Sequence, residues 1–160
     1  MIEILPLSAL PEALETCIAW ADREWGTVAG FAPEDWKAEF QRIEDSPVDQ
    51  VFVALNGGIP VGMVWLLEHE ALDSHLHFSP WLSSLVVDPA HRRQGIARAL
   101  AQHVEAYASL GADETLYLLT ERPGFYFPLG WEVADTAVLG AKNVFVMQKM
   151  LALPAPDGQD

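Results

Sequence analysis

Residues 81–100 read WLSSLVVDPAHRRQGIARAL, and this stretch decides the fold. The apolar run from Leu82 to Val87 is typical of a strand, and Asp88-Pro89 ends it. A short basic turn then leads to Gly95 and to a segment rich in helix-forming residues. We therefore expect a strand, a turn and a helix in direct succession.

The turn between this strand and this helix has the properties of an anion site. The first N–H groups of a helix lack intrahelical partners and lie at the positive end of the helix dipole. Gly95 has no Cβ, so a phosphate can approach its backbone closely. Arg92, Arg93 and Arg98 are three of only nine Lys and Arg residues in a chain of net charge −14. We predict that a phosphorylated ligand binds here.

The same turn resembles motif A of the GCN5-related N-acetyltransferases. That motif has Arg or Gln, two residues, Gly, one residue, and then Gly or Ala; here it reads Arg92-Arg93-Gln94-Gly95-Ile96-Ala97. The resemblance implies that acetyl-coenzyme A is the co-substrate and that the loop holds its pyrophosphate. It also implies that the preceding strand binds the pantetheine arm and the thioester carbonyl through backbone groups, where an N–H would favour the developing oxyanion. The donor-binding residues implied in this way are Leu85, Val86, Val87, Arg92, Arg93, Gln94, Gly95, Ile96, Ala97 and Arg98. The alternative is an ordinary strand-to-helix turn whose glycine relieves strain.

A second segment, GFYFPLGW at residues 124–131, resembles the Phe-Tyr-x-x-x-Gly-Phe segment of the same family. Tyr126 matches the tyrosine that stands near the sulfur of acetyl-coenzyme A and acts as general acid to the leaving thiolate. A phenol with a reference pKa near ~10 is protonated at neutral pH and able to donate. The alternative is a core tyrosine on a short aromatic helix. Pro128 predicts that this helix is very short.

The order of strand and helix patterns along the chain is the mixed α/β order of this family. Asn56-Gly57-Gly58 between two β-rich runs predicts a hairpin. The expected strands are 2–5, 51–55, 61–67, 82–87, 115–119, 131–138 and 143–150, and the expected longer helices are 10–25, 33–45 and one beginning near residue 96. The resemblance implies a central twisted mixed sheet flanked by helices.

Apolar residues at helical spacing predict the buried faces of these helices. The predicted faces are Leu10, Leu14, Cys17, Ile18, Ala21 and Trp25 on the first helix, Trp36, Phe40 and Ile43 on the second, and Ile96, Leu100, Val104 and Tyr107 on the third. The resemblance makes Trp25, Phe31 and Trp36 candidate walls of an acceptor site, with simple core packing as the alternative.

Several residues are candidates for removing the proton from the attacking amine. An ammonium with a pKa near ~10 must lose a proton before attack. Glu68, near the end of the strand 61–67, and Glu121, after the strand 115–119, are the leading candidates, followed by Glu70 and His77. His75 and His77 lack an obvious third ligand nearby, so no metal site is expected.

Composition limits the remaining alternatives. A length of 160 residues suits one domain, predicted over residues 1–152, with a flexible tail at 153–160. A pI near 4.5 argues against nucleic acid and would attract cationic small molecules or basic peptides, although acidity also serves solubility alone. One cysteine allows no internal disulfide and fits a cytoplasmic setting. From these residues we expect neither a secretory signal nor a membrane-spanning segment, and a homodimer stays an alternative.

The sequence thus predicts an N-acetyltransferase that moves an acetyl group from acetyl-coenzyme A to a primary amine of a small molecule or peptide. Two alternatives remain. One is a non-catalytic, regulatory module that binds acyl-coenzyme A, and the other is the same fold with a longer acyl donor.

Overall fold

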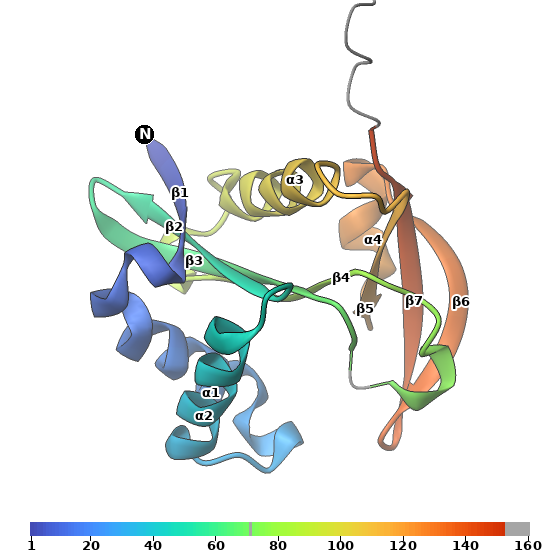
Figure 1. Cartoon of the computed structure of the whole chain (residues 1–160), viewed down its shortest axis with the longest axis horizontal. Coiled ribbons are helices and arrows are strands. Elements are labelled where there is room, and N and C mark those ends of the chain that lie inside the picture. The colour runs from blue at the N-terminus through green and yellow to red at the C-terminus, as the bar shows by residue number, and fades with distance from the viewer. Residues whose placement is uncertain (71, 153–160) are drawn as a thin grey trace, which may run out of the picture. The chain divides into compact units, whose positions relative to one another are not determined.

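The computed structural model describes residues 1–70 and 72–152, which form a seven-stranded sheet in the order β1-β2-β3-β4-β5-β7-β6 (Figure 1). Strand β4 pairs with β5 in parallel, while the pairs β1·β2, β2·β3, β5·β7 and β6·β7 are antiparallel. The predicted mixed sheet is confirmed. The tail predicted at 153–160 lies outside the described residues.

By its contacts the chain divides into two compact units. The first unit comprises Met1–Leu66 and Ser84–Ala101, and the second comprises Leu67–Ser83 and Gln102–Asp160. The assignment of residues 1–152 to a single domain stays a prediction. Within the described residues, no helix has both the length and the apolar character needed to cross a bilayer.

The N-terminal part of the chain supplies the strands and helices of the first unit. They are β1 (Ile2–Pro6), the 3-10 turns η1 (Leu7–Ala9) and η2 (Pro11–Ala13), α1 (Leu14–Ala29), α2 (Pro33–Asp45), β2 (Gln50–Asn56) and β3 (Ile59–Leu67). The hairpin predicted around Asn56-Gly57-Gly58 is β2 and β3. Strand β4 (Trp81–Val87), the 3-10 turn η4 (Pro89–His91) and helix α3 (Ile96–Ala108) follow further along the chain.

Strands β2 and β3 are buried along almost their whole length because helices cover both faces of this part of the sheet. Figure 1 shows α1 and α2 on one face and the start of α3 on the other. On the α2 side, the rings of Phe40 and Trp65 lie 5.1 Å apart. On the α3 side, a Cβ added at Gly62 would lie 2.9 Å from the Val86 carbonyl oxygen and 3.1 Å from Leu100 Cδ1. Glycine at 62 therefore lets α3 pack closely on β3.

Helix α1 begins and ends later than the predicted range 10–25. Pro11 begins the 3-10 turn η2, so regular α-helical geometry starts only at Leu14. Gly26 does not end the helix, which continues to Gly30, where a left-handed φ of 70° stops it. Cys17 is buried as predicted, and Trp20, absent from the predicted face, is buried as well.

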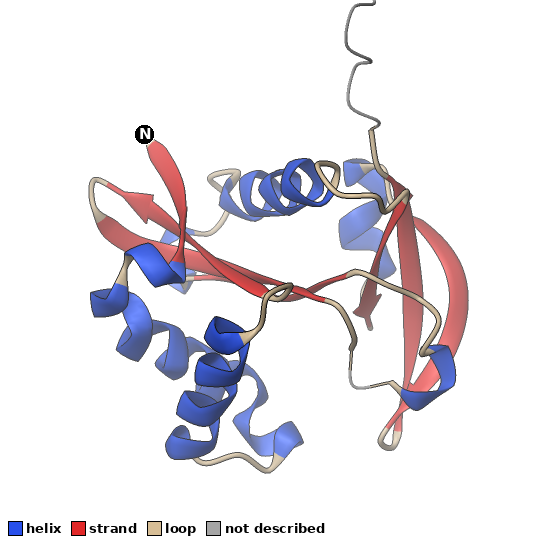
Figure 2. Cartoon of the chain, in the orientation of Figure 1, coloured by secondary structure: helices blue, strands red, loops and turns tan. Residues whose placement is uncertain are grey.

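The second unit is built around three antiparallel strands, β5, β6 and β7. Its elements are η3 (Asp73–His75), β5 (Thr115–Thr120), α4 (Pro123–Tyr126), η5 (Phe127–Leu129), β6 (Glu132–Leu139) and β7 (Lys142–Met150), with β7 lying between β5 and β6 (Figure 2). Helix α4 has only four residues, as Pro128 predicted.

The prediction that Tyr107 belongs to the buried face of α3 is wrong. Ile96, Leu100 and Val104 are buried, but Tyr107 is 40% exposed and Ala108 is buried instead. Ala101 is buried as well, which moves the centre of the buried face away from Tyr107. With 3.6 residues per turn, position 108 lies closer than position 107 to the mean direction of residues 100, 101 and 104. A small residue there lets the last turn of α3 pack inward.

Candidate functional site

The turn after β4 is fixed by hydrogen bonds at its entrance. The Asp88 N–H donates to the Val61 carbonyl at 2.8 Å, which ties the end of β4 to β3. The Asp88 carboxylate accepts from the Ala90 N–H at 3.0 Å, and the His91 N–H donates to the Asp88 carbonyl at 2.8 Å. Asp88-Pro89 thus ends the strand and starts the tight turn η4. The predicted succession of strand, turn and helix is confirmed.

The backbone at the start of α3 requires glycine and is open to solvent. Gly95 has a φ of 79°, and Arg93 also has a left-handed φ of 65°. The Ala99 N–H donates to the Gly95 carbonyl at 3.0 Å, so Gly95 is the residue from which the helix starts. A Cβ at Gly95 would meet no heavy atom within 4 Å. The space beside the unpaired N–H groups of the first helical turn is therefore free for an anion.

The three arginines of this turn differ in their partners. Arg92 Nε donates to the Val87 carbonyl at 3.2 Å, and Arg92 Nη2 lies 3.4 Å from Glu24 Oε1 on α1. Within residues 1–70 and 72–152, Arg93 and Arg98 form no ion pair, and both are exposed. Arg92 thus braces the turn and shares its charge with Glu24. Arg93 and Arg98 keep their positive charges unpaired at the helix start.

Strand β4 is not regular along its length. Ser84 has a φ of 52°, which is uncommon for a residue with a Cβ, and Leu85, Val86 and Val87 follow it directly. The register of β4 with β5 consists of Trp81 opposite Tyr117, which precedes this irregular residue. The sequence contained no signal for it, because Ser-Ser inside an apolar run is compatible with an ordinary strand.

Tyr126 is the last residue of α4, is half-buried and contacts two aromatic rings. The ring centroid of Phe125 lies 4.9 Å from that of Tyr126, and the ring of buried Trp131 lies 6.2 Å away, both edge-on. Burial raises the pKa of Tyr126 to about 12. The phenol is therefore neutral at every physiological pH. Among the described residues, no protein group is hydrogen-bonded to its hydroxyl.

The candidate bases lie on the surface of the second unit. Glu68 Oε1 lies 3.4 Å from His69 Nε2, and Glu121 Oε2 lies 3.4 Å from Lys142 Nζ. The side chains of Glu68 and Glu121 are 51% and 57% exposed. His77 is exposed, and Glu70 is half-buried. Solvent can reach each of these groups, so each could pass a proton to water.

His75 has a structural partner that the sequence did not reveal. Its Nε2 lies 2.8 Å from Asp135 Oδ2 on β6, sixty residues away, and its Nδ1 lies 2.7 Å from Ser74 Oγ. The hydrogen bond with His75 holds the pKa of the Asp135 carboxyl below its usual value. In the part of the chain that the structure describes, no group of three His, Cys, Asp or Glu side chains is placed to hold a metal.

The candidate wall residues Trp25, Phe31 and Trp36 have different surroundings. Trp36 is buried against Trp65 at 6.4 Å between ring centroids, so it is part of the core of the first unit. Phe31 packs edge-on against Trp36 at 4.9 Å but is 38% exposed. Trp25 is half-buried. Of the three side chains, that of Phe31 is the most exposed to solvent.

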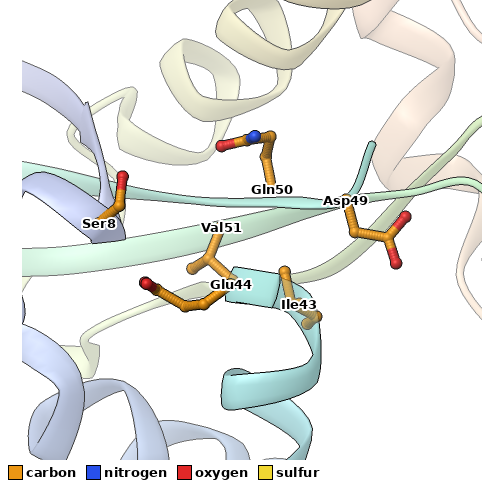
Figure 3. Close-up of a pocket in the computed structure, with 6 residues that line it drawn as sticks. All are labelled: Ser8, Ile43, Glu44, Asp49, Gln50 and Val51. Atoms are coloured by element: carbon orange, nitrogen blue, oxygen red, sulfur yellow. The ribbon is translucent and has the colours of Figure 1, made fainter. Parts of the chain in front are cut away.

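Two cavities lie elsewhere on the surface. One of ≈ 60 Å³ is lined by Ser8, Ile43, Glu44, Asp49, Gln50 and Val51 (Figure 3). Figure 3 shows the Glu44 and Asp49 carboxylates pointing away from each other, and Asp49 is held by Arg42 at 3.1 Å. The other, of ≈ 340 Å³, lies on the hairpin of β6 and β7. Neither contains a predicted site residue, so neither supports a ligand role for those residues.

Residues 47–133 match the family model described as the acetyltransferase (GNAT) domain. Solved structures share the fold at low sequence identity. An aminoglycoside 6′-N-acetyltransferase complexed with coenzyme A matches with a TM-score of 0.75 and 17% identity, over 98% of this chain and 99% of that one. The PaiA N-acetyltransferase of Thermoplasma acidophilum in complex with coenzyme A matches with a TM-score of 0.65 and 22% identity, over 94% of this chain and 99% of that one. YncA of Salmonella typhimurium with its cofactor acetyl-CoA matches with a TM-score of 0.64 and 18% identity, over 99% of both chains.

Proposed function

The chain belongs to the acetyltransferase (GNAT) family, and we propose that it transfers an acetyl group from acetyl-coenzyme A to a primary amine of a small molecule or peptide. The observation that carries this proposal is the turn before α3. There a left-handed Gly95 with open space beside it, unpaired helix N–H groups and two unpaired arginines occur together. This combination suits a pyrophosphate.

The donor is proposed to bind along β4 and the turn. Backbone N–H groups of residues 93–97 would donate to the pyrophosphate, and Arg93 and Arg98 would balance its charge. The backbone of Leu85, Val86 and Val87 would hold the pantetheine arm and the thioester carbonyl. The irregular φ of Ser84, at 52°, supports this role because it interrupts the strand geometry immediately before these residues. The structures that contain coenzyme A or acetyl-CoA, named above, also support this donor.

The chemistry requires a neutral amine that attacks the carbonyl carbon of the thioester. A C–N bond forms, the C–S bond breaks, the nitrogen loses a proton and the thiolate gains one. We assign to Tyr126 the stabilisation of the departing thiolate. A phenol whose pKa is raised to about 12 is a weaker acid than a thiol of pKa near ~8.5. Tyr126 therefore stabilises the departing sulfur through a hydrogen bond from its hydroxyl. The thiolate takes its proton from solvent or from the base that received the proton of the amine.

The base is proposed to be Glu68 or Glu121, acting directly or through water, with Glu70 and His77 as further candidates. Their exposure supports rapid exchange of protons with solvent. A cationic acceptor is supported by the net charge of −14 and by the activity named for the aminoglycoside acetyltransferase. A cytoplasmic location and a homodimer both stay predictions.

An acceptor screen tests the proposal. The release of free thiol from acetyl-coenzyme A is followed with a polyamine, an amino sugar and a peptide N-terminus, beside a longer acyl-coenzyme A as donor. We expect one amine class to accelerate thiol release with acetyl-coenzyme A. Binding of coenzyme A without amine-dependent release would instead favour the non-catalytic module.

Tyr126→Phe further separates the acetyltransferase from the non-catalytic module, because it removes only the hydroxyl. We expect turnover to fall by roughly 10²-fold while donor affinity changes little. Tyr117→Phe is the matched control, since Tyr117 is stacked on Phe78 at 4.4 Å and has no assigned chemistry. A stable Tyr126→Phe protein with full turnover would remove Tyr126 from the mechanism.

A further inference from the structure

We propose that Lys149 is a positioning residue that fixes the segment carrying Tyr126, an inference that rests on the function proposed for that tyrosine. Lys149 lies on β7, and its Nζ donates to the Leu129 carbonyl at 2.7 Å. The same Nζ lies 2.8 Å from Glu105 Oε1 on α3. One ammonium thus connects a strand, a helix and the turn that follows Tyr126.

The segment after Tyr126 is short and has few internal hydrogen bonds. The Gly130 N–H donates to the Phe127 carbonyl at 3.1 Å, and the Trp131 N–H donates to the Tyr126 carbonyl at 3.3 Å. Carbonyl groups at the end of such a turn lack partners within the turn itself. Lys149 supplies the partner for Leu129, and a cation is favoured at this end of a helical segment.

The ion pair is sheltered, so it differs from ordinary surface pairs. The side chains of Lys149 and Glu105 are 26% and 16% exposed, whereas those of Lys142 and Glu121 are 52% and 57% exposed and their charged atoms lie 3.4 Å apart. Glu105 Oε2 is buried with no partner among the described residues. Removing the ammonium would therefore leave a sheltered carboxylate without its counter-charge, and both Glu105 and the turn would rearrange.

Packing around Gly130 strengthens this contact. Gly130 has a φ of 92°, and a Cβ added there would lie 3.2 Å from Lys149 Cε and 3.3 Å from Nζ. The absence of a side chain lets Lys149 pass directly over the turn. The buried ring of Trp131 packs against Tyr126 within the same segment. Tyr126 is thus held by Trp131 through its ring and by Lys149 through the backbone that follows it.

This arrangement predicts a defect in turnover rather than in donor binding when Lys149 is replaced. A displacement of about 1 Å in a reacting geometry costs roughly 10²-fold in rate. We expect Lys149→Met to lower kcat for thiol release by about 10-fold or more, with KM for acetyl-coenzyme A changing less than about 3-fold. Lys149→Arg keeps the charge and the donors and should restore most of the rate. Lys37→Met is the matched control: Lys37 lies on α2, is exposed and forms no ion pair among the described residues, so this change should leave kcat unchanged.

A double-mutant cycle tests whether Lys149 acts through Tyr126. If it does, Lys149→Met slows the wild-type protein but has little further effect in a Tyr126→Phe background. An equal loss of kcat in both backgrounds would overturn the proposal, because Lys149 would then act by another route. So would an unchanged kcat in a folded Lys149→Met protein.

A second measurement does not depend on activity. Fluorine NMR of protein labelled with 3-fluorotyrosine gives one resonance for each of the three tyrosines, and Tyr→Phe variants assign them. Lys149→Met should shift or broaden the Tyr126 resonance and leave those of Tyr107 and Tyr117 in place. An unmoved Tyr126 resonance would overturn the proposal. If Tyr126→Phe is fully active while this resonance moves, the function assigned to Tyr126 fails and the positional link to Lys149 stands.

If Lys149→Met does not fold, Glu105→Gln replaces it in both measurements. The amide keeps an acceptor for Lys149 and removes the charge, so the same changes are expected at smaller size. An unmoved Tyr126 resonance together with unchanged kcat would then overturn the proposal.

Discussion

Replacing Gly95 by alanine separates the backbone role of this residue from its proposed role in donor binding. The φ of 79° lies in the left-handed region, where a residue with a Cβ costs about 1–2 kcal/mol. No heavy atom lies within 4 Å of the new Cβ, so no steric clash adds to that cost. We therefore expect the free energy of unfolding to fall by about 1–2 kcal/mol. Urea denaturation measures it.

Gly140→Ala is the matched control for this strain. Gly140 lies in the turn between β6 and β7 with a φ of 62°, and a Cβ there also meets no atom within 4 Å. Both variants should lose a similar amount of stability. Only Gly95→Ala places a methyl group where the pyrophosphate is proposed to lie, which would remove one charge-assisted hydrogen bond worth about 1.5–3 kcal/mol. Affinity for coenzyme A should fall about 10- to 150-fold.

Titration calorimetry with coenzyme A on both variants decides the matter. The expected result is a large loss of affinity for Gly95→Ala and wild-type affinity for Gly140→Ala. If both proteins lose stability as expected but bind coenzyme A equally well, the pyrophosphate does not approach Gly95. The donor site would then have to be sought elsewhere.

Three further predictions use other groups of the site. Because burial raises the pKa of Tyr126 from 10.0 to about 12, the unfolded chain releases this proton first as the pH rises. This difference in pKa contributes about 2–3 kcal/mol to the free energy of unfolding below pH 10, and the contribution is lost as the pH rises through 12. In urea denaturation at alkaline pH, the wild-type protein should therefore lose more stability than Tyr126→Phe. Of Glu68→Gln and Glu121→Gln, the variant that lacks the base should lose the acid limb of the pH profile of kcat/KM; if both keep it, the proton leaves through another group or bulk water. Glu24→Gln frees the exposed Arg92 and should tighten binding of coenzyme A by about 2- to 5-fold, whereas weaker binding would show that the pair preorganises the turn.

The parts of the fold that depend on local patterns could be predicted from the sequence. The alternation and turn residues around Asn56-Gly57-Gly58 identified the hairpin, and the apolar run before Asp88-Pro89 identified β4. Pro128 limited the length of α4 because it restricts helical continuation. The succession of strand, basic turn and helix was predictable for the same reason, since each step depends on neighbouring residues.

Features that depend on residues distant in sequence could not be predicted. The bond from His75 to Asp135 and the contacts of Lys149 with Glu105 and Leu129 join separate elements. No spacing rule relates these positions. The left-handed backbone of Ser84 could not be predicted, because it is imposed by the surrounding structure and not by the preference of serine. The predicted face of α3 failed at Tyr107, where helical spacing alone did not determine burial.

The chain passes between its two compact units three times, and none of these passages is a loop. The first occurs inside β3, between Leu66 and Leu67, the second inside β4, between Ser83 and Ser84, and the third inside α3, between Ala101 and Gln102. Cutting at any of them would sever a strand or a helix and expose its interior. Split fragments or inserted domains are therefore better placed in the hairpin turns at Gly57 or Gly140, where the backbone pairs on both sides can still form.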